Sequence, residues 1–95
     1  MVLLISYDLN GHERPAAYAR VKKLIETGAG AGNFVKPLYS QWLVDTQGTA
    51  TTWREYLQQT GGIDSNDRLL VTEVTRNWDG WLDQTVIDWV AARVK

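Results

Sequence analysis

Hydrophobic and polar positions along the first half of this chain alternate between strand-like and helix-like patterns. Residues 2–9 are almost continuously apolar, which is typical of a central strand covered on both faces. Apolar positions then recur at helical spacing from Pro15 until Gly28, which predicts a first helix. Residues 34–38 and 42–46 predict two short strands, and the link between them favours a bulge or sharp bend over a tight two-residue turn.

The second half of the chain repeats the same alternation. Thr residues that can cap a helix precede a second helical segment at residues 49–59, which ends before a pair of glycines. Residues 67–75 are dense in Val, Leu and Thr and predict a fourth strand. A last helix is predicted at about residues 78–93, with Asn77 or Asp79 as its N-cap.

The order of these elements predicts an α+β fold. Strand, helix, strand, strand, helix, strand is the ferredoxin-like (βαββαβ) plan, here with an additional C-terminal helix. Right-handed crossovers then give a four-stranded antiparallel sheet of order 4-1-3-2, with the first strand in the interior. A length of 95 residues fits a single ferredoxin-like domain that spans residues 1–95.

The candidate chemistry lies at the carboxyl end of the first strand, where Asp8 ends the apolar run. The predicted topology gathers polar side chains at this end of the sheet: Asp8, Asn10, His12, Glu13, Ser40, Asp64, Asn66 and Asp67. Carboxylates with Ser and Asn oxygens are the ligands that Mg²⁺ or Mn²⁺ prefers. The same residue types also close turns and cap helices, and this structural interpretation remains open beside the metal site.

Composition and motifs narrow the function classes. The net charge of −1 gives no overall basic surface, so any binding of nucleic acid must come from a local patch or a dimer. Cysteine is absent and no apolar run is long enough for a membrane span, which favours a cytoplasmic protein. GxSxG and HExxH are missing, and His12 is the only histidine. The glycines of GAGAGN follow a helix instead of preceding one, unlike a phosphate loop.

Five Trp residues are unusual for a chain of this length. A small domain has little interior for them, and Trp is enriched at protein interfaces. The predicted C-terminal helix carries Trp78, Trp81 and Trp89, and its apolar residues cover a wider arc than a core stripe needs. We therefore expect these three residues to form an interface, with burial in the core as the alternative that remains open for each of them.

Three segments, ISYDLN, LYSQWLVDT and DSNDRLLVTEV, carry a family resemblance. They resemble the small ferredoxin-like, nuclease-like CRISPR-associated proteins of spacer acquisition, and also the related SinR-like and VapD-type small bacterial proteins. The resemblance spans about residues 3–75 and implies a ferredoxin-like homodimer. It also implies that Asp8 binds a divalent metal for RNA or DNA cleavage and that Ser40 belongs to the catalytic site. The GAGAG segment and the Trp-rich end depart from the family pattern.

Three functions follow as hypotheses. The first is a homodimeric Mg²⁺- or Mn²⁺-dependent endonuclease or nucleic-acid scaffold in which Asp8 and Ser40 form the site. The second is a non-catalytic assembly or regulatory module that uses the Trp-rich helix as its partner surface. The third is a small-molecule sensor with a ligand between sheet and helices or at a dimer interface, although the sequence selects no ligand.

Overall fold

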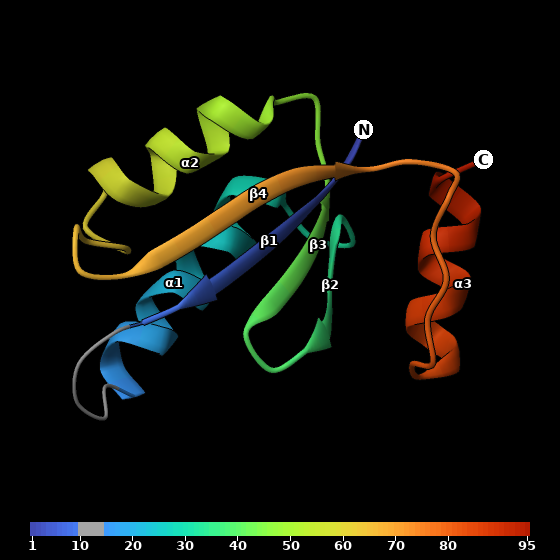
Figure 1. Cartoon of the computed structure of the whole chain (residues 1–95), viewed down its shortest axis with the longest axis horizontal. Helices are drawn as coiled ribbons and strands as arrows, with labels where there is room; N and C mark the ends of the chain where they lie inside the picture. Colours follow the sequence, from blue (N-terminus) through green and yellow to red (C-terminus); the bar gives the residue numbers. More distant parts are fainter. Residues whose placement is uncertain (10–14) are drawn as a thin grey trace.

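The computed structural model describes residues 1–9 and 15–95, which form a four-stranded antiparallel sheet with helices on its faces (Figure 1). The elements are β1 (Val2–Asp8), α1 (Pro15–Ala29), β2 (Phe34–Leu38), β3 (Gln41–Asp45), α2 (Ala50–Gln59), β4 (Arg68–Val74) and α3 (Gln84–Arg93). The strand order is β2-β3-β1-β4, which is the predicted order read from the other edge. The α+β class and the interior place of β1 are therefore confirmed.

Helices α1 and α2 cover one face of the sheet. Side chains alternate along a strand, so Leu3, Ile5 and Tyr7 of β1 all point toward these helices. They form the larger core cluster with α1 and α2 side chains, among which Val21 and Leu57 are fully buried. Figure 1 shows α1 behind β1 and β4, while α3 stands apart from both other helices.

Helix α3 covers only part of the opposite face. Val2 of β1 and Leu43 of β3 form a second, smaller core with Val86 and Val90 of α3. All four lie at the end of the sheet where β1 begins, because Val2 pairs with Asp45 of β3 and Val74 of β4. The apolar run of β1 is therefore covered on both faces at its amino end but on one face at its carboxyl end. None of the helices in the described residues combines the length and apolar character of a membrane span.

Local signals in the sequence explain the start of α2 and the irregular pairing of β2. Thr49 and Thr52 form a reciprocal capping box at the start of α2, which satisfies backbone N–H groups that a helix start leaves unpaired. The link between β2 and β3 was predicted to be a bulge or sharp bend, which is wrong, because Leu38 pairs with Gln41 across a two-residue turn of Tyr39 and Ser40. The irregularity lies inside β2 instead, where the register shifts between Val35 and Leu38. Pro37 lies inside that irregular stretch, as expected for a residue that cannot donate a ladder hydrogen bond.

The predicted start of the last helix at residue 78 is wrong, because α3 begins at Gln84. The N-cap is Asp83 instead of Asn77 or Asp79, and its side chain makes no capping hydrogen bond. Gly80 disfavours helix by about 1 kcal/mol, and its N–H is taken by the Asp79 carboxylate at 2.7 Å. The chain from β4 instead runs beside α3 before it turns into that helix (Figure 1).

Candidate functional site at the carboxyl end of β1

Asp8 lies at the carboxyl end of β1 with its side chain exposed. Its register partner is Arg68, the first residue of β4. Alternation along β1 places Asp8 on the same face as Ser6 and Leu4, which is the face that α3 covers at the other end. The carboxylate is thus accessible and belongs to the uncovered part of that face.

Ser40 lies at the same end of the sheet as Asp8. The backbone N–H of Tyr7, the residue before Asp8, donates to the Ser40 carbonyl at 3.1 Å. Ser40 is half-buried in the link between β2 and β3. The carboxyl end of β1 and the β2–β3 link therefore meet at one end of the sheet.

The acidic residues of the α2–β4 loop serve the turn itself. An oxygen of the Asp67 carboxylate accepts from the Asp64 N–H at 3.0 Å, and the Asp64 carboxylate accepts from the Asn66 N–H at 2.8 Å. Asp67 is 7% exposed. These hydrogen bonds favour the structural interpretation for this loop, since side chains that hold their own turn are typical of Asx motifs.

A metal centre within one chain finds little support in the described residues. In residues 1–9 and 15–95, no three or more His, Cys, Asp or Glu side chains lie close enough together to hold a metal ion. Asn10, His12 and Glu13, which the sequence also placed at this end of the sheet, lie outside the described residues. The role of Asp8 as a metal ligand stays a prediction.

A row of aromatic rings lies at the same end of the sheet, on the face that α1 covers. The ring of Tyr7 lies 5.9 Å from that of Tyr18 on α1, and Tyr18 lies 5.7 Å from Tyr39 in the β2–β3 link. The Tyr7 hydroxyl accepts from the Trp42 indole N–H at 2.9 Å. Burial raises the pKa of Tyr7, and the hydrogen bond from Trp42 opposes part of that rise. The row connects the core to Tyr39, which is 75% exposed.

The positively charged ammonium group of Lys36 lies beside these aromatic rings. Its ammonium nitrogen lies 4.8 Å from the Tyr39 ring centroid and 5.6 Å from that of Trp42, both within cation–π range. It also donates to the carbonyls of Leu38 and Tyr39. Partial burial lowers the pKa of Lys36. Sequence reasoning missed this cluster. The signal that could have indicated it is a Lys in β2 that precedes by three residues a Tyr in the β2–β3 link.

The uncovered part of the α3 face forms a surface that we call the open half-face. It consists of Ser6, Asp8, Leu38, Gln41, Arg68 and Leu70, placed on one side by the registers Ser6↔Gln41, Ser6↔Leu70, Leu38↔Gln41 and Asp8↔Arg68. Leu38 is 53% exposed and Leu70 is 60% exposed. The half-face thus combines exposed apolar side chains with one acid and one base.

The three Trp residues predicted to form an interface differ in their surroundings. Trp89 is half-buried, donates to the Gly32 carbonyl at 3.2 Å and lies 4.1 Å from the Arg93 guanidinium. Trp78 is half-buried against the second core. Trp81 is 100% exposed and lines an apolar groove of about 380 Å³ with Leu38 and other side chains. Trp81 is therefore the Trp of the three with its whole side chain available to a partner.

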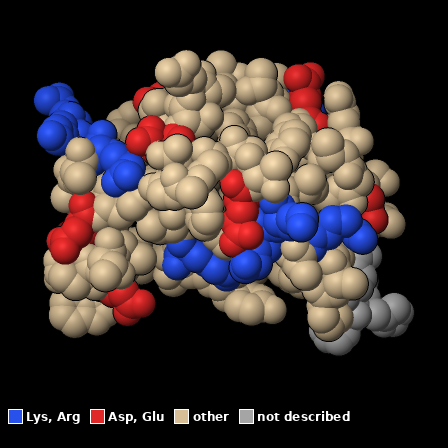
Figure 2. Space-filling view, turned by 180° about the vertical axis from the view of Figure 1, so that it is seen from behind, with Lys and Arg blue, Asp and Glu red and all other residues tan. Residues whose placement is uncertain are grey.

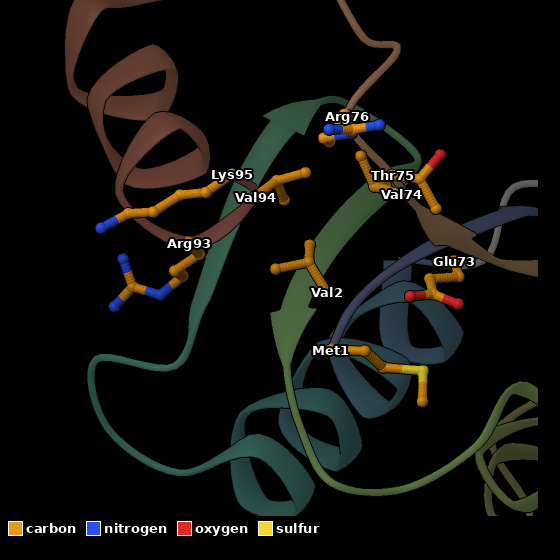
Figure 3. A pocket seen from close by; sticks show the side chains of 9 residues that line it. All are labelled: Met1, Val2, Glu73, Val74, Thr75, Arg76, Arg93, Val94 and Lys95. Atoms are coloured by element: carbon orange, nitrogen blue, oxygen red, sulfur yellow. The ribbon is translucent and has the colours of Figure 1, made fainter.

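A second hollow, of about 440 Å³, lies where β1 begins and where β4 and α3 end (Figure 3). Its charged lining residues are Glu73, Arg76, Arg93 and Lys95. Figure 3 shows Arg93 and Lys95 on one side and Arg76 on another, so these basic groups do not converge on a common point. Arg93 moreover pairs with Asp45 at 3.1 Å. This hollow offers no arrangement for chemistry.

Comparison of the chain with protein-family models, with curated proteins and with solved structures found no match in any of the three.

Proposed function

We propose that this protein is a ferredoxin-like homodimer that cleaves nucleic acid with Mg²⁺ or Mn²⁺ bound by Asp8. The observation that carries the proposal is the exposed Asp8 carboxylate on the open half-face, at the end of the sheet where Ser40 also lies. The resemblance of its strand-end and middle segments to the CRISPR-associated nuclease-like proteins points the same way. A chain without cysteine suits the cytoplasm, where such a protein would meet its substrate.

The open half-face supports a two-fold dimer. In a two-fold pair each copy uses the same patch, so a patch that is apolar and has both charges can complement itself. Leu38 and Leu70 supply the apolar contact, and Arg68, the register partner of Asp8 in its own chain, offsets part of the carboxylate charge. In the proposed dimer the two-fold axis passes close to Asp8, so that the two Asp8 carboxylates come together.

Two Asp8 carboxylates make a more suitable ligand set than one. Mg²⁺ and Mn²⁺ favour oxygen ligands and often keep several waters, so one or two carboxylates are enough to hold the ion. A bound ion of this kind supplies a Lewis acid and a water whose pKa is lowered. In the proposed reaction the attacking water loses a proton to solvent and its oxygen bonds to phosphorus, while the bond to the leaving sugar oxygen breaks and that oxygen takes up a proton from solvent. In this proposal Ser40 orients the phosphate or the water before the attack.

Cleavage of labelled single-stranded RNA and double-stranded DNA, with Mg²⁺, Mn²⁺ or EDTA, tests the proposal. We expect metal-dependent cleavage that is lost in Asp8→Ala and in Asp8→Asn, which keeps the shape of the side chain. Asp83→Ala is the matched control, because Asp83 is an exposed acid whose side chain makes no capping hydrogen bond. Cleavage that survives Asp8→Ala would overturn the role of Asp8.

The complete exposure of Trp81 favours a second candidate function, a non-catalytic assembly module. In this alternative Trp81 packs against a second copy of the chain, whose apolar groove of about 380 Å³ lies on the same surface. Light scattering should then show that Trp81→Ala weakens association while circular dichroism stays unchanged. A dimer that forms equally well without Trp81, in a protein that cleaves nucleic acid, would exclude this alternative.

A further inference from the structure

The link between β2 and β3 presents an aromatic ring to solvent in a fixed orientation. Tyr39 is 75% exposed, yet its ring lies 5.7 Å from Tyr18, which in turn lies 5.9 Å from the buried Tyr7. A ring held by its neighbours loses little conformational entropy when a ligand stacks on it. Tyr39 can therefore stack against a flat aromatic ring such as a nucleobase.

Positive charge lies at this ring and on the helix behind it. Lys36 places its ammonium 4.8 Å from the Tyr39 centroid. It also lies near Trp42, whose ring faces α1, so Lys36 and α1 lie on the same side of the sheet. The solvent side of α1 carries Arg20, Lys22 and Lys23, all exposed.

The charges of α1 are only partly neutralised. Lys22 pairs with Glu26 at 2.8 Å, whereas Arg20 and Lys23 have no carboxylate within ion-pair distance among the described residues. Figure 2, which views the molecule from the α1 side, shows Lys and Arg side chains in a band across this face with some acidic side chains beside them. The net charge of −1 for the whole chain hides this local patch.

We infer that Tyr39, Lys36, Arg20 and Lys23 form a binding surface for single-stranded nucleic acid, which we call the tyrosine platform. A base stacks on Tyr39 while the basic side chains contact the phosphates, the combination that single-strand binding proteins use. Bases in a duplex have no free face for such stacking, so the platform selects unpaired strands. This inference rests on the proposed function and names its substrate class.

The position of the platform relates it to the candidate site. Tyr39 precedes Ser40, whose carbonyl accepts from the Tyr7 N–H next to Asp8. Figure 1 shows the β2–β3 link at the same end of the sheet as the tip of β1 and the start of α1. The platform lies on the α1 side of the sheet and Asp8 on the opposite face, so a strand bound on Tyr39 reaches Asp8 by continuing around this end of the sheet.

Fluorescence anisotropy with a short labelled single strand, measured in EDTA at low salt, tests binding without cleavage. We expect Tyr39→Ala to weaken binding about ten-fold, the usual effect of losing one stacked base, and Tyr39→Phe to bind as wild type. Arg20→Gln and Lys23→Gln should each make the salt dependence less steep by about 0.7 in the log–log slope. Thr85→Ala, a change at an exposed and uncharged residue of α3, is the control and should bind normally.

The outcomes separate this inference from the proposed function. Asp8→Ala should still bind single strands in EDTA, at least as tightly as wild type, because it removes a negative charge near the strand and leaves the platform intact. Binding in EDTA without any metal-dependent cleavage would keep the platform and overturn the nuclease. No binding by wild type, equal binding by Tyr39→Ala, or tighter binding of a duplex would overturn the platform, even if Asp8-dependent cleavage were found.

Discussion

Replacing Tyr7 with Phe removes one buried hydroxyl, which accepts the hydrogen bond of the Trp42 indole N–H. Tyr7 is 6% exposed and Trp42 is 3% exposed, and the Trp42 indole N–H donates to the Tyr7 hydroxyl at 2.9 Å. The variant leaves this N–H buried without its acceptor, which costs about 1–3 kcal/mol. At roughly 4–8 °C per kcal/mol for a domain of this size, a loss of about 2 kcal/mol lowers Tm by roughly 8–16 °C.

Urea and thermal unfolding followed by circular dichroism measure this loss. Tyr39→Phe is the matched control, because it removes a hydroxyl from a ring that is 75% exposed. We expect the control to change the unfolding free energy by no more than about 0.5 kcal/mol. A Tyr7→Phe variant as stable as the control would show that the buried hydrogen bond does not stabilise the fold.

The raised pKa of Tyr7 extends the same prediction to alkaline pH. Burial favours the neutral phenol, so the pKa is higher in the folded protein than its value of about 10 in the unfolded chain. The resulting stability is complete below pH about 10 and is lost as pH rises through the folded pKa. Wild type should therefore lose more stability above pH 10 than Tyr7→Phe does. Equal losses in the two proteins would contradict the assignment.

Three further variants test the packing, each by urea unfolding. Val90→Ala should cost about 2 kcal/mol, since Val90 is 2% exposed in the second core and loses two methyl groups; a neutral result would mean that α3 is not docked there. Gly62→Ala should cost about 1–3 kcal/mol, because the new Cβ would lie 2.5 Å from Leu24 Cδ1 and 3.1 Å from the backbone carbonyl oxygen of Leu57, which a side-chain rotation cannot relieve; unchanged stability would contradict these close contacts. Arg93→Ala should cost about 1 kcal/mol, less at high salt, because its pair with Asp45 is only partly buried; a salt-independent loss would assign the effect to packing.

Much of the fold could be predicted because local and long-range signals agree. The unbroken apolar run of residues 2–9 indicated an interior strand, and Val2–Asp8 does lie between two neighbours. Thr49 predicted the start of α2 because a cap needs only residues that are close in sequence. The strand order followed from the sequence of elements together with the handedness of crossovers.

The last helix shows where periodicity alone was insufficient. Trp78, Trp81 and Leu82 have helical spacing with the residues of α3, yet they precede the helix. Half-buried Trp78 and Leu82 pack against the second core from the segment between β4 and α3. Their apolar side chains therefore indicate that this segment is partly buried, and they do not indicate that it is helical. Gly80 was the contrary signal, because glycine disfavours helix.

The candidate site was predicted in part. Asp8, Ser40 and Asp67 do lie at one end of the sheet, since topology alone brings those strand ends together. The use of Asp64 and Asp67 within their own turn depends on side-chain geometry, which a sequence does not contain. The row from Tyr7 to Tyr39 joins three elements and could not be recognised before their packing was known.

Titration of Mn²⁺ followed by electron paramagnetic resonance examines the proposed metal site itself, because it requires no substrate. If paired Asp8 carboxylates hold the ion, wild type and Asp83→Ala bind one Mn²⁺ for every two chains and Asp8→Ala binds none. Absence of saturable Mn²⁺ binding, or binding that Asp8→Ala leaves unchanged, would contradict a metal site formed by paired Asp8 carboxylates.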